Sequence, residues 1–447
     1  MVVANNQLVN NDTTLGSYYN DNTSNNIKKS NSHNRYDRER KIAWLLSFPN
    51  SGTSYTTKLV KRVTQTSTAT NYGEESDFLD PVTGGNVPVV KWSSGGPFWA
   101  SSRSSSSSNR IIHDDVDHRG DLSSPLVLTK THCTGRCVSC TAKEYLKNLT
   151  EFYNGCQTGK RYHVVAGNYA NHAEISSNST AVAVIVDKNT KTRHSIIKKY
   201  QKTLEVTHYD AAKLVTKAIH LLRNPLDNIV ARFHLARKRS RKKGESHFEE
   251  FTSKYSNDRE GFREWCRHLD EKEEYLKVER ELFLSEDFSD YSGVDFNEVL
   301  ISKIINGMTN DNNYIGKTIL RAMEGIPCHA DFFRYVQWHN LAFRMISEMN
   351  IPELVLRYEN YESNFDFTVY SILLFLGFHL NDYGDGNDSD GGSVSNGDTR
   401  IMRGKPKEFV GGKSYVNYFT VDEIGKVREL MRLVGSEVTW DHVRHYF

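Results

Sequence analysis

The chain has 447 residues, 38% of them hydrophobic, and its 57 basic and 55 acidic side chains leave a net charge of +2. Length alone allows up to about three domains, and this hydrophobic content is enough for a sizeable core. The near-neutral charge gives no general reason to expect a nucleic-acid partner. The sequence contains no run of 18 apolar residues, so no transmembrane segment is expected.

The N-terminal residues 1–38 are rich in Asn, Ser and charged side chains and poor in apolar ones, which predicts a disordered tail. Met1 is not followed by a basic segment and an apolar run, so no secretory signal is expected. Two locations stay open on this basis. The cytoplasm is expected if no anchor exists, and the Golgi lumen is expected if an N-terminal anchor is missing from the gene model.

Residues 42–63 predict a strand, a tight turn and a helix in that order. The apolar run 42–46 indicates a buried strand, Pro49-Asn50-Ser51-Gly52 indicates the turn, and 53–63 can continue as a helix. Backbone N–H groups at such a junction point at an anion, and the helix dipole favours negative charge. Gly52 allows close approach of a ligand. A Ser/Thr-rich junction without a ligand is the alternative. A nucleoside-triphosphate loop is not expected here, because no Gly-Lys-Ser/Thr follows this turn at the required spacing.

Residues 64–124 show little periodicity, contain a serine run and are expected to form an inserted loop. The strand that follows this loop ends in residues that can take part in catalysis. The apolar run 125–128 predicts a short strand that ends in Thr129-Lys130-Thr131-His132. Ligands of open α/β sheets lie at the carboxyl ends of strands, and side chains two residues apart share one side. His132 could therefore remove a proton from an alcohol with Lys130 beside it. The alternative is a surface lysine and a capping histidine.

Four cysteines occur close together, within an expected inserted loop over residues 133–180. Their spacing, C-x3-C-x2-C-x15-C, is loosely similar to that of zinc ligands. Disulfide pairing is an equal alternative, and free thiols are the simpler expectation for a cytosolic protein. The four residues are Cys133, Cys137, Cys140 and Cys156.

A second anion site is predicted around Arg223. Residues 218–222 indicate a strand, Arg223 stands at its end, and Asn224-Pro225 begins a helix in which Asp227 suits a cap or dipole partner. An arginine there can hold a phosphate through two hydrogen bonds, whereas a structural pair with Asp227 is the alternative. The basic run in 235–246 is expected to be a solvated part of an inserted loop over 235–257, or else to attract an acidic acceptor.

The C-terminal third predicts further helices and one strand. Helices are expected over 258–284, 329–349 and 365–378, a strand over 352–359, and a flexible Gly/Asp-rich loop over 382–398. Thr420 is expected to cap a last helix that runs from Val421 to Leu433.

In chain order, these motifs resemble those of the sulfotransferase family. Pro49 to Tyr55 is similar to the family's 5′-phosphosulfate loop, and Lys130-Thr131-His132 to its Lys-Thr-His motif. Arg223 to Asp227 resembles its 3′-phosphate motif, the strand ending in Tyr358-Glu359 its Tyr-Glu strand, and Arg403-Gly404 its basic C-terminal loop.

The sequence departs from the family pattern at three places. Asn50 stands where many members have a lysine, Ala231 stands where the 3′-phosphate motif has a serine, and Gly404 and Lys405 are exchanged in order. These departures leave open a catalytically inactive nucleotide-binding module. A P-loop kinase is the other alternative.

The resemblance implies an α/β fold: a P-loop-like three-layer sandwich with a central, mainly parallel sheet flanked by helices. A single domain over 39–447 would carry the long insertions. It implies sulfuryl transfer from 3′-phosphoadenosine 5′-phosphosulfate (PAPS) to a hydroxyl or amine of a small molecule or carbohydrate, with no metal required. His132 would be the general base and Lys130 would stabilise charge on the transferring group. Acceptor identity and oligomeric state stay open.

The resemblance also implies which residues bind the donor. Arg223 and Arg403 would hold the 3′-phosphate, and Tyr55 would stack on adenine. The full donor-binding set is Pro49, Asn50, Ser51, Gly52, Thr53, Ser54, Tyr55, Arg223, Asp227, Arg403 and Gly404.

Overall fold

The computed structural model describes residues 40–64, 66–76, 86–90, 96–100, 126–135, 148–166, 180–183, 198–272, 322–378 and 414–447. The chain divides into a unit from Met1 to Glu39 and a unit from Arg40 to Phe447, and the second is the subject here. The tail expected over 1–38, the loop expected over 382–398, and Arg403 and Gly404 lie outside the described residues.

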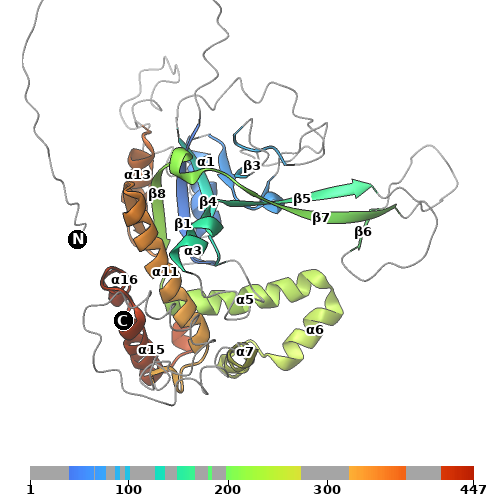
Figure 1. The fold of residues 1–447 in the computed structure, drawn as a ribbon. Helices are drawn as coiled ribbons and strands as arrows, with labels where there is room; N and C mark the ends of the chain where they lie inside the picture. The colour runs from blue at the N-terminus through green and yellow to red at the C-terminus, as the bar shows by residue number, and fades with distance from the viewer. Residues whose placement is uncertain are drawn as a thin grey trace, which may run out of the picture. The chain divides into compact units, whose positions relative to one another are not determined.

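A six-stranded sheet forms the centre of this unit (Figure 1), in the order β3-β2-β4-β1-β8-β9. Every neighbouring pair is parallel except β2 and β3. The expected α/β fold with a mainly parallel sheet is therefore confirmed. The strands are β1 (Lys41–Ser47), β2 (Thr68–Thr70), β3 (Phe98–Ala100), β4 (Leu126–Thr131), β8 (Val215–Leu222) and β9 (Glu353–Arg357).

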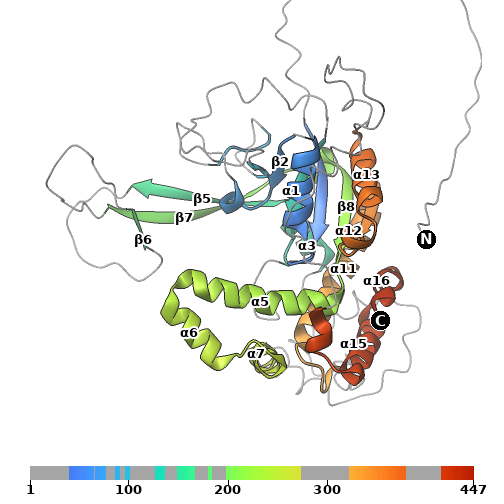
Figure 2. The same ribbon diagram turned by 180° about the vertical axis from the view of Figure 1, so that it is seen from behind.

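Helices cover both faces of the sheet because the strands bury side chains on both. In β1, the side chains of Ile42, Trp44 and Leu46 join one hydrophobic cluster, and those of Ala43 and Leu45 join another, as the two-residue period of a strand requires. The second cluster includes α1 (Thr53–Thr64), α12 (Asn360–Ser363) and α13 (Phe365–Leu376), and Figure 2 shows the sheet from the side of α1. The first includes α3 (Leu149–Cys156), α5 (Pro225–Lys243), α7 (Arg259–Lys272), α11 (His329–Met349), α15 (Val421–Val434) and α16 (Glu437–Val443).

Three segments expected as inserted loops contain regular structure. β2 and β3 come from 64–124, and their three-residue lengths are too short to produce a periodic pattern. Residues 133–180 contribute α3 and β5 (Thr158–Ala166), which pairs antiparallel with β7 (Lys198–His208) beside β6 (Thr180–Ala183) in a second sheet. Within 235–257, α5 continues to Lys243 because Lys and Arg are good helix formers. It ends at Gly244 (φ +128°), and α6 (Glu245–Lys254) follows.

The parallel order places three chemically important strand ends side by side. β1 lies between β4 and β8, with Leu46 opposite both Thr131 and His220. The residues that follow these strands therefore emerge at one edge of the sheet. That edge is where open α/β sheets bind ligands. The last helix expected from Thr420 is also present, with a capping box between Thr420 and Glu423.

Candidate active site

The loop between β1 and α1 has a backbone shape that only particular residues allow. Asn50 has φ +68° and Gly52 has φ +96°, in the left-handed region where Asn and Gly are the best tolerated residues. A Cβ atom on Gly52 would lie 2.1 Å from a ring carbon of Tyr358. Glycine is therefore required at this position for both conformation and space.

Side chains from the next parallel strand and its helix hold the carbonyl groups of this loop. Arg223, after β8, donates from Nη1 to the carbonyl oxygen of Asn50 at 2.8 Å. Asn228, on α5, donates from Nδ2 to the carbonyl oxygen of Pro49 at 3.0 Å and to Ser51 Oγ at 3.1 Å. The loop is thus fixed from the α5 side, and no group among the described residues accepts the Ser51 hydroxyl proton.

The N–H groups at the start of α1 are correspondingly available. Among the described residues, the backbone N–H groups of Gly52, Thr53 and Ser54 have no hydrogen-bond partner. The first N–H groups of a helix are unsatisfied by geometry, and together with the helix dipole they favour an anion. Ser47 Oγ lies 2.7 Å from Thr53 Oγ1 and connects this helix start to the end of β1. These features are what an anion site requires, and anion binding at this loop stays a prediction.

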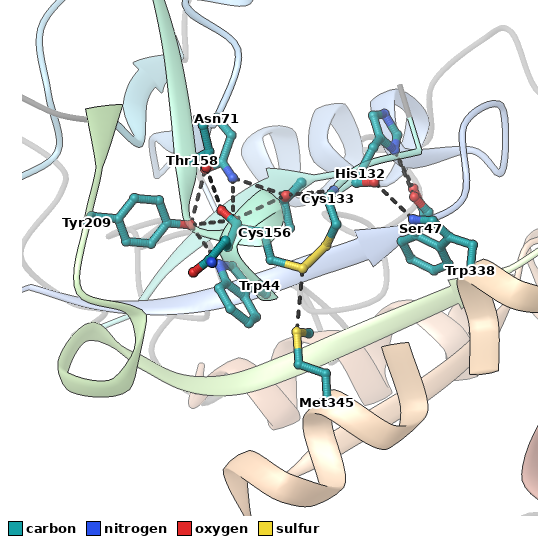
Figure 3. Close-up of a disulfide and its surroundings, with 12 residues drawn as sticks. Trp44, Ser47, Asn71, His132, Cys133, Cys156, Thr158, Tyr209, Trp338 and Met345 are labelled. Carbon is teal, nitrogen blue, oxygen red and sulfur yellow. Dashed lines mark hydrogen bonds between the residues drawn. A yellow bond between two sulfur atoms is a disulfide. The ribbon is translucent and has the colours of Figure 1, made fainter. Parts of the chain in front are cut away.

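His132, directly after β4, is buried and held from several directions (Figure 3). Its Nδ1 lies 2.8 Å from the carbonyl oxygen of Ser47. A carbonyl oxygen only accepts hydrogen bonds, so Nδ1 carries the proton and Nε2 is the basic nitrogen. The ring stacks on Tyr72, whose hydroxyl accepts from the His132 backbone N–H at 2.9 Å. Trp338 Nε1 donates to the His132 carbonyl oxygen at 2.9 Å.

The side chain of Lys130 reaches the beginning of α1. Its Nζ forms an ion pair with Glu75 Oε1 at 3.0 Å and lies 3.5 Å from Ser54 Oγ. Glu75 belongs to the 3-10 helix η2 (Gly73–Glu75), within a region that the sequence assigned to an inserted loop. The structure therefore brings Lys130 together with the loop between β1 and α1.

Arg223 lies at the same edge of the sheet. Its guanidinium lies over the Tyr358 ring at 4.9 Å, and its buried Nε has no hydrogen-bond partner in the part of the chain that the structure describes. Tyr335 donates its hydroxyl to the Arg223 carbonyl oxygen at 2.6 Å. Arg223 is thus fixed by its backbone and ring contacts while it keeps a donor for a ligand.

Of the two roles expected for Asp227, the structure gives the N-cap to Asn224 and leaves Asp227 in the first turn of α5, where a carboxylate suits the helix dipole. Asn224 is the N-cap of α5, because its Oδ1 accepts from the N–H groups of Leu226 and Asp227. The buried Asp227 instead accepts from the backbone N–H of Tyr415 at 3.2 Å. Tyr415 lies in the 3-10 helix η5 (Ser414–Asn417). Asp227 therefore connects α5 to the segment that follows the expected basic C-terminal loop.

The geometry argues against adenine stacking by Tyr55. Its ring is 8% exposed and packs against Tyr358 and Tyr361, at centroid distances of 6.1 and 5.0 Å. Burial, followed by the nearby Tyr358, raises the pKa of Tyr55 to about 12. Arg232, next to Ala231, is engaged in an ion pair with Asp331.

A disulfide supports the end of β4 from behind (Figure 3), which corrects the expectation of free thiols. Cys133 bonds to Cys156, and Cys156 Sγ lies 3.5 Å from Met345 Sδ. The Cys156 carbonyl oxygen accepts hydrogen bonds from Asn71 at 2.6 Å and from Tyr209 at 3.1 Å. Cys137 and Cys140 lie outside the described residues, among which no group of side chains suits a metal ion.

Several residues of the site carry no recognisable signal in the sequence. Asn228 adjoins the Arg223 motif but is not part of it, and Tyr72 and Glu75 stand in a segment without periodicity. Trp338 lies within the helix expected over 329–349. Their contacts depend on strand order, which one sequence does not reveal.

A mainly parallel sheet with an anion-type loop at its carboxyl edge defines an α/β protein of the P-loop-like class. The family model described as "Sulfotransferase domain" matches residues 40–287, more than half of the chain. The chain belongs to this family. No curated protein and no solved structure gives a match. Among the described residues, no helix has the length and apolar character needed to cross a bilayer.

Proposed function

We propose that this protein transfers the sulfuryl group of PAPS to a hydroxyl or amine acceptor, of which a carbohydrate is one candidate. The observation that carries the proposal is the meeting of three groups at one sheet edge. These are the loop from Pro49 to Ser54 with unsatisfied N–H groups, the Lys130 ammonium and His132. Family membership supports sulfuryl transfer as the reaction class.

In the proposed reaction, His132 Nε2 takes the proton of the acceptor while the acceptor oxygen or nitrogen bonds to sulfur. The bond between sulfur and the phosphate oxygen breaks, and 3′-phosphoadenosine 5′-phosphate (PAP) leaves. Lys130 and the N–H groups of residues 52–54 neutralise the charge that develops on the sulfuryl and leaving oxygens. Arg223 donates a hydrogen bond from Nε to the 3′-phosphate. These roles need positioning and charge but no metal.

Calorimetric titration with PAP, set against ATP with magnesium, tests the donor assignment. Tight binding of PAP without binding of ATP supports it and justifies an acceptor screen scored by PAP release from PAPS. Preference for ATP would replace it with a kinase. His132→Ala is expected to keep PAP binding and lose turnover, and unchanged turnover would refute the base assignment. If the wild type binds PAP without turnover for any acceptor class, an inactive nucleotide-binding module is the better description.

Two disulfides support a location for this activity. Cys133 pairs with Cys156, and Cys266 pairs with Cys328. Stable disulfides are rare in the reducing cytosol and common in secretory compartments. We therefore favour an oxidising lumen over the cytoplasm. Fractionation of expressing cells tests this, and a cytosolic protein with reduced thiols at these positions would contradict it.

A further inference from the structure

The short segment from Asn71 to Glu75 touches every residue of the proposed catalytic strand end. The Asn71 backbone N–H donates to the Lys130 carbonyl oxygen at 3.1 Å, and its side chain donates to Thr131 Oγ1 at 3.0 Å. Tyr72 stacks on His132. Glu75 contacts the side chain of Lys130. The segment is thus part of the site, although the family motifs do not include it.

Glu75 is the acidic member of this segment that reaches the Lys130 ammonium. Its Oε1 lies 3.0 Å from Lys130 Nζ, and its Oε2 accepts from Thr70 Oγ1 at 3.2 Å. The Lys130 side chain is 10% exposed, whereas that of Glu75 is 31% exposed. The carboxylate therefore faces solvent on one side and directs a mostly buried ammonium toward Ser54 on the other.

We propose that Glu75 is a positioning residue for sulfuryl transfer: its carboxylate holds the Lys130 ammonium beside Ser54 until the donor binds. The inference rests on the proposed function. Lysine has a long, flexible side chain with a large rotamer entropy, so a fixed partner places the cation before the donor arrives. Because the pair is partly exposed, it is weak enough to yield to a donor carrying several negative charges.

The position of Glu75 has two opposing consequences for the reaction. Its negative charge repels an anionic donor and competes with it for Lys130, so the carboxylate weakens donor binding. The same carboxylate orients the ammonium, so it speeds the transfer step. Removing the charge is therefore expected to change donor affinity and turnover in opposite directions.

The test compares wild type, Glu75→Gln and the control Glu348→Gln. The control removes the same charge from an exposed residue that pairs with Arg344 on α11. PAP affinity is measured by calorimetry, and kcat and KM are measured as PAP release from PAPS, with water as acceptor where none better is known. Glu75→Gln is expected to lower kcat about tenfold and to lower KM and Kd about threefold or more. The control is expected to stay within about twofold of wild type.

A second comparison shows whether Glu75 acts through Lys130. On a Lys130→Ala background, Glu75→Gln is expected to cause no further loss of kcat and to restore part of the PAP affinity, because a negative charge that repels the donor has been removed. Glu75→Asp retains the negative charge but places the carboxylate farther from the Lys130 ammonium. The kcat is therefore expected to fall without the decrease in KM.

Three results would overturn the inference. A loss of kcat near a thousandfold in Glu75→Gln, with donor binding unchanged, would make Glu75 a direct proton acceptor. Unchanged kinetics with a lower thermal midpoint would make its role structural. A wild type that binds no PAP would refute the proposed function as well, whereas an active wild type with a kinetically unchanged Glu75→Gln would refute only the inference.

Discussion

Substituting Gly52 by alanine is expected to be the most damaging single-methyl change in the loop. Gly52 has φ +96°, and an added Cβ would lie 2.1 and 2.3 Å from two carbons of the Tyr358 ring. The left-handed conformation costs an alanine about 1–2 kcal/mol. The overlap must be relieved by movement of the ring or the loop, and such overpacking costs about 1–3 kcal/mol. Gly52→Ala should therefore lower the free energy of unfolding by about 2–5 kcal/mol.

Two other glycines separate the two contributions. Gly377 has φ +84°, and no atom of the described residues lies within 4 Å of an added Cβ, so Gly377→Ala should lose only the conformational term, about 1–2 kcal/mol. Gly425 lies inside helix α15, where an added Cβ meets none of the described side chains, so Gly425→Ala should gain about 0.5–1 kcal/mol. Neither glycine lies at the site.

Denaturant unfolding and calorimetric titration with PAP measure these effects. Gly52→Ala should unfold at lower denaturant and bind PAP about a hundredfold more weakly, because displacement of the loop by about 1 Å misplaces its N–H groups. Both controls should bind PAP normally. Wild-type PAP affinity in Gly52→Ala, or equal destabilisation in Gly52→Ala and Gly377→Ala, would show that the contact with Tyr358 does not shape the loop.

Three further predictions concern the contact that holds the loop and the packing of helix α11. Asn228→Ala should cost about 1–3 kcal/mol in denaturant unfolding and weaken PAP binding at least about tenfold, because it frees the loop from α5; unchanged affinity would contradict this. Burial, then the charges of His220 and His442, hold the pKa of His339 well below its usual value. The unfolded chain takes up that proton below about pH 6.5, so stability is full above this pH and declines by up to about 1.4 kcal/mol per pH unit below it. His339→Phe should flatten this slope in unfolding curves. The paired substitution Cys266→Ser/Cys328→Ser should cost about 2–5 kcal/mol, and an unchanged thermal midpoint would refute it.

Much of the fold could be predicted because its central strands are long and strongly apolar. Residues 42–46 and 218–222 form strands where the sequence indicates them, and the helix expected over 329–349 is α11. The failures are short or charged elements. β2 and β3 have three residues each and depend on a neighbouring strand for stability, and the basic end of α5 has no apolar stripe to reveal it.

The candidate site was predictable where it follows a strand and not where it depends on tertiary contact. Lys130, His132 and Arg223 stand directly at strand ends, and the parallel order brings them to one edge. Tyr55 is the opposite case. Its position within the motif suggested a ligand contact, but the helical turn directs its ring into the core beside Tyr361. Neighbours from residue 358 onward, far along the chain, decide that outcome.

The same geometry accounts for the neutral residue in the phosphosulfate-type loop. Asn50 adopts φ +68°, a left-handed conformation in which asparagine is favoured among non-glycine residues and a lysine is not. Its carbonyl oxygen is held by Arg223, so the residue contributes loop shape rather than charge. In the proposed function, the cation beside this loop is Lys130 on the neighbouring strand β4, whose Nζ lies 3.5 Å from Ser54 Oγ. Lys130→Ala should therefore lower kcat, measured as PAP release from PAPS, more than any neutral substitution at Asn50.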